Sequence, residues 1–128
     1  YKNYSHIEFK GLMQWEEFMP ILQKARMMVL PAEWSENNPL TVIESQSLST
    51  PVLGANIGGI PELIVEGGKS AAAMVPNGMT FTSGDVEDLK DKIEKMFACD
   101  FDYQAIAKDA IERYSSDAYY HKLMEYYK

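Results

Sequence analysis

The stretch MMVLPAEWSENNPLTVIESQSLSTPVLG, residues 27–54, decides the fold. It begins with the continuous apolar run Met27–Leu30 and ends with a second strand-like run, Pro51–Gly54. Such runs are typical of strands that are buried on both faces of a sheet. Between them we expect a helix over residues 40–48, because Asn38 and Pro39 suit a helix start. The stretch therefore predicts a strand–helix–strand unit, in which the two strands run parallel.

The same alternation continues on both sides of this unit. Asp85 is expected to cap a strongly amphipathic helix that carries Val86, Leu89, Ile93, Met96 and Phe97. The other elements expected are short strands at His6–Phe9 and Met79–Phe81, a helix over Trp15–Ala25 that Pro20 kinks or restarts, and two helices around residues 106–111 and over 116–127. The pattern predicts an α/β fold, a Rossmann-like parallel sheet flanked by helices on both faces. Such sheets bind ligands beyond the carboxyl ends of their strands, where the loops 31–39 and 55–61 are expected to lie.

Composition narrows the classes of function. The chain has 128 residues, which is enough for one domain with a real core. The net charge of −7, with acids spread along the chain, argues against nucleic acid as a partner. No apolar run approaches the roughly 20 residues that span a bilayer, and the N-terminus has no apolar signal segment. Cys99 is the only cysteine, so a reducing, cytoplasmic location is expected. Association with a membrane surface stays open.

The predicted helix start at residue 39 has the features of an anion site. Asn38 suits the N-cap and Pro39 the first helical position, where its missing N–H costs nothing. The N–H groups of Leu40 and Thr41 would then point out of the helix at the carboxyl end of a strand, and the Thr41 hydroxyl would add a donor. Glu36 lies just before the helix, and Glu44 lies more than one turn inside it. A diphosphate held there would have one carboxylate near each end.

Two weaker patterns suggest a P-loop and a metal-binding pair, and the surrounding sequence argues against both. Gly68-Lys69-Ser70 imitates the end of a phosphate-binding P-loop, but that motif needs glycine where this sequence has Leu63. Asp100-Phe101-Asp102 has the spacing of a metal-binding pair but falls between two predicted helices instead of at a strand end. We therefore expect no metal site and no cofactor.

Glu36 and Glu44 are separated by seven residues, and this spacing matches the E-x7-E motif of retaining glycosyltransferases of family 4. Further segments match that family in order and spacing: Phe9–Gly11, which resembles the opening of the base-binding loop; Leu30–Trp34, which resembles "PSxW" with Ala32 for serine; Thr50–Val52, which resembles "GTPV" with Ser49 for glycine; Gly58–Glu62, which matches "GGxPE"; and Asn77-Gly78 with Gly84-Asp85, which match "NG…GD". The resemblance covers nearly the whole chain.

The resemblance implies a GT-B fold, in which two Rossmann-like domains face each other. Residues 1–128 would be a single, partial C-terminal donor-binding domain. The implied activity is retaining transfer of a sugar from a nucleotide sugar to an acceptor hydroxyl. The implied roles are: Glu36, the catalytic candidate, at the hydroxyls of the transferred sugar; Asn38, Pro39, Leu40 and Thr41 at the sugar and diphosphate; Glu44 at the ribose; Gly11, Leu12 and Met13 beside the base; and Gly58 and Gly59 near the cleft, in donor binding or in a purely structural role.

Three departures from the family pattern limit what the chain is expected to do alone. The basic "GR…K" element that clamps the diphosphate is absent, as is the N-terminal domain expected to bind the acceptor, which is a glycan, a lipid or a small molecule. The connection over residues 67–76 is longer than the family's usual turn. We expect this chain alone to be inactive. Two alternatives stay open: a non-catalytic nucleotide or nucleotide-sugar binding module, and a GT-B relative that epimerises nucleotide sugars.

Overall fold

The computed structural model describes residues 4–67 and 74–127. Three strands form one parallel sheet in the order β1 (Met28–Leu30), β2 (Val52–Ala55) and β3 (Gly78–Phe81). Leu53 in the central strand lies opposite Val29 on one side and Met79 on the other. Every residue of β2 is buried, which explains its unbroken apolar character. The predicted α/β fold with a Rossmann-like parallel sheet is confirmed.

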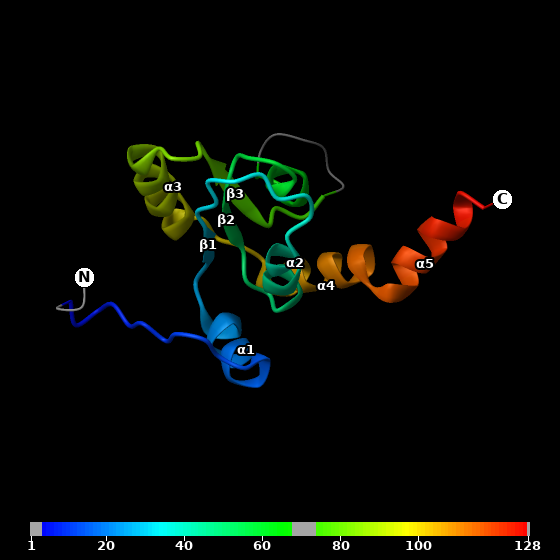
Figure 1. Ribbon diagram of the computed structural model, residues 1–128, viewed down its shortest axis with the longest axis horizontal. Coiled ribbons are helices and arrows are strands. Elements are labelled where there is room, and N and C mark those ends of the chain that lie inside the picture. Colours follow the sequence, from blue (N-terminus) through cyan, green and yellow to red (C-terminus); the bar gives the residue numbers. More distant parts are fainter. Residues whose placement is uncertain (1–3, 68–73, 128) are drawn as a thin grey trace.

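Helices cover both faces of this sheet (Figure 1). α2 (Leu40–Ser47) packs against β2 and α4 (Tyr103–Tyr114), and α3 (Val86–Ala98) packs against β2 and β3. α2 buries Val42, Ser45 and Gln46, whose spacing places them on one face of the helix. α1 (Trp15–Lys24) and α5 (Ser116–Glu125) extend away from the sheet at opposite ends of the chain (Figure 1). None of these helices, in the part of the chain that the structure describes, has the length and apolarity that a bilayer crossing requires.

The turn from β3 into α3 confirms the predicted cap. The Asp85 carboxylate accepts hydrogen bonds of 3.0 Å from the backbone N–H groups of Glu87 and Asp88. One turn further on, the Asp88 carboxylate accepts a bond of 2.7 Å from the N–H of Thr82. This bond from the backbone of Thr82 lowers the pKa of Asp88 below its usual range. The exit of β3 is therefore tied to the first turn of α3.

The predicted strand His6–Phe9 is wrong. These residues lie exposed and form no strand, and they pair with none of the three strands of the described sheet. As a result β1 is an edge strand and is not buried as predicted, since 37% of the Val29 surface remains exposed. Pro20 does not restart the helix, because α1 runs through it from Trp15 to Lys24. The P-loop-like Gly68-Lys69-Ser70 and most of the connection 67–76 lie outside the described residues.

The amino end of the sheet holds two features of the turn between α2 and β2. Ser49, at the position where the resemblance implies glycine, has φ +72°, the left-handed region that favours glycine. The neighbouring Thr50 is buried, and its hydroxyl donates a 2.6 Å hydrogen bond to the carbonyl oxygen of Leu22 in α1. This bond ties α1 to the sheet at the end opposite the carboxyl edge.

Candidate functional site

The loops that follow the three strands meet at the carboxyl edge of the sheet. The N–H of Gly59, after β2, donates a 2.7 Å hydrogen bond to the carbonyl oxygen of Glu36, after β1. The hydroxyl of Ser83, after β3, donates a 2.9 Å bond to the carbonyl oxygen of Ala32 in the same β1 loop. The loop 31–39 is therefore held from both sides. In Figure 1 it crosses the top of the sheet before it enters α2.

Two glycines allow the closest of these contacts. Gly58 has φ +57°, and a Cβ there would lie 2.5 Å from the carbonyl oxygen of Glu36. A Cβ on Gly59 would lie 1.8 Å from the carbonyl oxygen of Asn37. Both obstacles are backbone atoms, which cannot turn aside as a flexible side chain can. The structure thus gives Gly58 and Gly59 a packing role against the loop that carries Glu36, while their contact with a donor stays a prediction.

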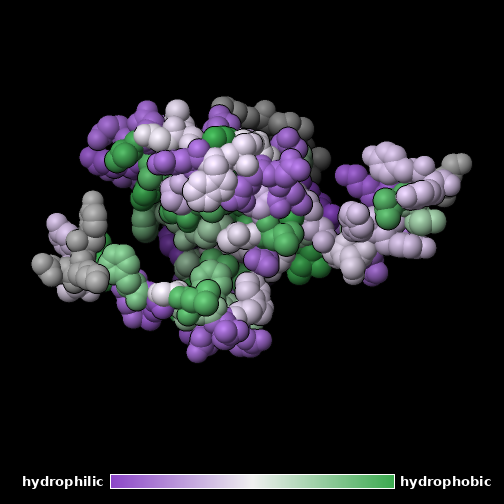
Figure 2. Space-filling view, in the orientation of Figure 1, coloured by the Kyte–Doolittle hydropathy of each residue, from purple (hydrophilic) through white to green (hydrophobic). Residues whose placement is uncertain are grey.

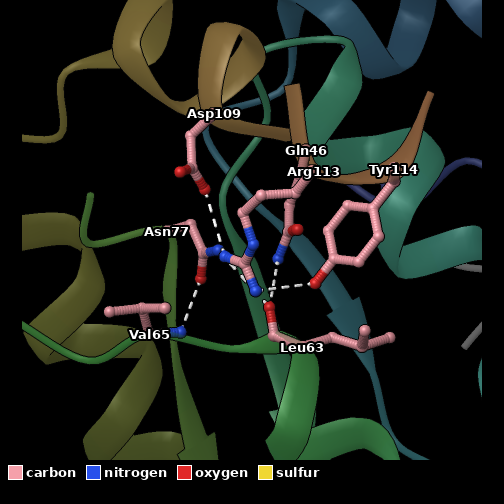
Figure 3. Close-up of polar contacts among 7 residues, drawn as sticks. All are labelled: Gln46, Leu63, Val65, Asn77, Asp109, Arg113 and Tyr114. Carbon is pink, nitrogen blue, oxygen red and sulfur yellow. Dashed lines mark hydrogen bonds and ion pairs between the residues drawn. The ribbon is translucent and has the colours of Figure 1, made fainter. Parts of the chain in front are cut away.

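The turn after β2 leads into a short 3₁₀ helix, η1 (Ile60–Leu63), which is held by hydrogen bonds from two side-chain amides of the core. The carbonyl oxygen of Leu63 accepts hydrogen bonds from the side-chain amides of Gln46, at 2.9 Å, and Asn77, at 3.3 Å. Figure 3 shows this pair beside Arg113 of α4, whose guanidinium contacts Asp109 at 3.1 Å and Tyr114 at 2.8 Å. Both amides are almost fully buried, so η1 has little freedom to shift. The glycine turn is therefore backed by a buried, polar layer of the core.

The start of α2 differs by one position from the prediction. Pro39, not Asn38, occupies the N-cap position, with φ −67° and ψ 110°, and Asn38 is exposed and caps nothing. The first backbone bond runs from the N–H of Val42 to the carbonyl oxygen of Pro39. Among the described residues no partner accepts from the N–H groups of Leu40 or Thr41. Because proline has no side-chain acceptor, the helix start keeps these donors available for an external anion.

The two glutamates lie on either side of this helix start. Glu36 is half-buried in the loop before α2, and Glu44 is exposed within the helix. Residues i, i+3 and i+4 of a helix share a face, so Leu40, Thr41 and Glu44 lie together, and all three are exposed. Side chains of a helix lean toward its N-terminus, which directs Glu44 back toward the free N–H groups. The structure therefore brings the predicted residues from 36 to 44 together at one edge.

Sequence reasoning assigned no role to Trp34, which the structure places in this site. Its indole Nε1–H donates a 3.1 Å hydrogen bond to Oε1 of Glu36. The sequence carried two signals for it: Trp34 is the tryptophan of the segment that resembles "PSxW", and it stands two residues before the candidate carboxylate.

Gly11, Leu12 and Met13 are not brought to this edge. They precede α1, and this segment lies with α1 beyond the amino ends of the strands, at the opposite end of the sheet from the loop 31–39 (Figure 1). A groove of about 430 Å³ lies here, formed with α1 residues that include Trp15 and Phe18. Figure 2 shows hydrophobic surface where the N-terminal segment and α1 lie. The assignment of these three residues to the base of the donor stays a prediction.

The described part of the chain holds no group of three or more His, Cys, Asp or Glu side chains close enough to bind a metal ion. The expectation that the reaction needs no metal stays a prediction, and the start of α2 is the alternative means of holding an anion.

Comparison with known proteins agrees with this arrangement. The family model described as glycosyl transferases, group 1, matches residues 1–113. An uncharacterized glycosyltransferase of Methanocaldococcus jannaschii is 30% identical over 91 residues, which make up 71% of this chain and 23% of that protein. The sulfoquinovosyl transferase of Arabidopsis thaliana is 34% identical over 88 residues, which make up 69% of this chain and 16% of that protein. The chain thus spans less than a quarter of the length of these relatives.

Proposed function

Because this chain belongs to the glycosyl transferases of group 1, we propose that it is the donor-binding part of a retaining glycosyltransferase of the GT-B type, family 4. The parent enzyme would move a sugar from a nucleotide sugar to an acceptor hydroxyl. One observation carries the proposal: the uncapped start of α2 opens at the carboxyl edge of the sheet, between Glu36 and Glu44.

The position of each group suits one part of the donor. The unpaired N–H groups of Leu40 and Thr41, together with the helix dipole, would hold the diphosphate. Glu44 leans toward the same point from one turn inside the helix and would accept hydrogen bonds from the ribose hydroxyls. Glu36, on the other side of the helix start, would accept from hydroxyls of the transferred sugar. Carboxylates suit this purpose because they offer about four acceptor sites for paired hydroxyls.

The same groups would serve the reaction. When the bond between sugar and diphosphate breaks, negative charge develops on the phosphate oxygens, and fixed N–H groups at the helix start would stabilise it without reorganising. Attack by the acceptor on the face from which the diphosphate leaves would retain the configuration. None of these steps assigns a metal or a covalent nucleophile to the chain.

We propose that the rest of a longer protein binds the acceptor, which is a glycan, a lipid or a small molecule, and that the parent works in the cytoplasm. The share of its relatives that this chain spans supports the first of these proposals. Positioning of two reactants can lower the activation barrier of a reaction by roughly 7–11 kcal/mol. The chain alone, which presents only the donor side, should therefore bind a nucleotide sugar weakly and transfer nothing.

Products formed by the parent protein separate this proposal from its two alternatives. The parent is incubated with nucleotide sugars and candidate acceptors, and the products are followed by mass and by sugar stereochemistry. A glycosylated acceptor with retained configuration supports the transferase. An epimerised sugar with no acceptor product would favour the epimerase. Donor that is bound but never consumed would favour the binding module.

A further inference from the structure

Trp34 is an exposed aromatic side chain whose one polar atom is engaged at the candidate site. Its surface is 67% exposed, so burial in the core does not account for its place in the loop 31–39. An indole has a single hydrogen-bonding atom, the Nε1–H, and that atom donates to Oε1 of Glu36 at 3.1 Å. The other tryptophan, Trp15, instead packs its ring against Phe18, with ring centroids 6.3 Å apart.

The hydrogen bond from Trp34 restrains the side chain of Glu36, in addition to a bond that restrains its backbone. The backbone of Glu36 is already held by the N–H of Gly59 at 2.7 Å. The indole then engages one carboxylate oxygen, and no described residue donates to the other oxygen, Oε2. The carboxylate is thus oriented in the loop, and its second oxygen, Oε2, keeps acceptor capacity.

We propose that Trp34 is a positioning residue for the donor sugar: its indole N–H orients the Glu36 carboxylate so that Oε2 is presented to sugar hydroxyls. This inference rests on the proposed function, in which Glu36 contacts the sugar while α2 holds the nucleotide. Because Trp34 acts through Glu36, it contributes to binding of the nucleotide sugar and not to binding of the nucleoside diphosphate.

A bond that only stiffens the loop would behave differently. The loop leads directly into α2, so a general loosening of the loop would disturb the helix start. The affinities for the nucleotide sugar and for the nucleoside diphosphate would then fall together. A selective effect on the sugar-bearing ligand therefore distinguishes positioning from stiffening.

The test compares three pairs of ligands by calorimetry on the full chain: UDP-glucose with UDP, GDP-mannose with GDP, and ADP-glucose with ADP. Trp34→Phe keeps an aromatic ring and removes the N–H. For the pair that the unaltered chain binds, we expect Trp34→Phe to lower the affinity for the nucleotide sugar about three- to tenfold, which is the range for net loss of one hydrogen bond. The affinity for the nucleoside diphosphate should not change.

Two further variants make the result specific. Glu36→Gln should also lower only the affinity for the nucleotide sugar. The double variant should bind no more weakly than Glu36→Gln alone, because the two changes disrupt the same contact. Tyr119→Phe is the matched control: Tyr119 lies on α5, is as exposed as Trp34 at 67%, and also loses one donor while it keeps its ring. Its affinities should equal those of the unaltered chain.

The possible failures are distinguishable. Unchanged nucleotide-sugar affinity in Trp34→Phe, or an equal loss for UDP-glucose and UDP or the corresponding pair, would overturn the positioning role and leave the proposed function standing. Additive losses in the double variant would overturn it as well. Binding of none of the six ligands by the unaltered chain would contradict the proposed function itself, and the inference with it.

Discussion

The backbone N–H of Gly59 lies 2.7 Å from the carbonyl oxygen of Glu36 and donates a hydrogen bond to it. This bond joins the turn after β2 to the loop after β1, at the edge where a ligand of a parallel sheet is expected. The contact is so close that a Cβ on Gly59 would lie 1.8 Å from the carbonyl oxygen of Asn37. The position of the candidate sugar-binding carboxylate thus depends on a residue with no side chain.

Gly59→Ala should therefore damage both stability and donor binding. The added methyl group must push the 36–37 backbone away, and overpacking of this kind costs typically about 1–3 kcal/mol. Urea denaturation measures the stability, and calorimetry measures the affinity for a nucleotide sugar. Gly67→Ala is the control, because a Cβ there would meet Pro76 at an ordinary 3.7 Å. A Gly59→Ala variant that matches this control in both measurements would contradict the packing role.

Glu44→Ala should weaken nucleotide binding. If Glu44 accepts hydrogen bonds from the ribose, its loss should cost about 1.5–3 kcal/mol of binding free energy, which is roughly tenfold or more in affinity. Titration with the free nucleoside diphosphate is the measurement, since this ligand contains the ribose but no sugar. Glu94→Ala, an exposed glutamate on α3, is the matched control and should change nothing. An unaltered affinity in Glu44→Ala would rule out the ribose contact.

Activity of the parent enzyme should survive chelation of divalent metals. The expectation rests on the start of α2 as the anion site and on a sequence with no Asp-x-Asp pair at a strand end. Transfer rates are compared with and without excess EDTA. Complete loss of activity that magnesium or manganese restores would show that the diphosphate needs a metal after all.

Ser49→Gly should stabilise the fold. Ser49 has φ +72°, and this left-handed conformation costs a residue with a Cβ roughly 1–2 kcal/mol. Glycine removes that strain but gains freedom in the unfolded chain, which offsets roughly 0.5–1 kcal/mol, so the net gain should be about 0.5–1 kcal/mol.

Thermal and urea denaturation measure the effect of Ser49→Gly. Ser47→Gly, at the last residue of α2, is the control and should instead destabilise by about 0.5–1 kcal/mol. Destabilisation of similar size by both changes would mean that Ser49 carries no backbone strain.

Features with a local cause could be predicted from the sequence. The three observed strands and the main helices follow from apolar periodicity, and the cap by Asp85 follows from its side chain and the pattern after it. The strand expected at His6–Phe9 could not be judged locally, because a segment becomes a strand only if the path of the chain brings it alongside a sheet edge, and this segment pairs with no strand. The exposure of Val29 in β1 has the same origin.

For the candidate site, the motif located the residues but not their contacts. The group from Glu36 to Glu44 lies at one edge because a parallel crossover places it there. The link from Gly59 to Glu36 and the bond from Trp34 join backbone and side-chain atoms whose approach depends on three loops folding together. The start of α2 at Pro39 in place of Asn38 reflects a choice between adjacent residues, which propensity alone does not make.

The most direct test of the proposed donor site is a map of backbone amide and indole N–H shifts by NMR, recorded as a nucleotide sugar is added to this chain. If the start of α2 holds the donor, the largest changes fall on the N–H groups of Leu40 and Thr41, on Gly58 and Gly59, and on the indole N–H of Trp34. Changes confined to α3 or to the groove beside α1, with the start of α2 unaffected, would contradict the proposed donor site.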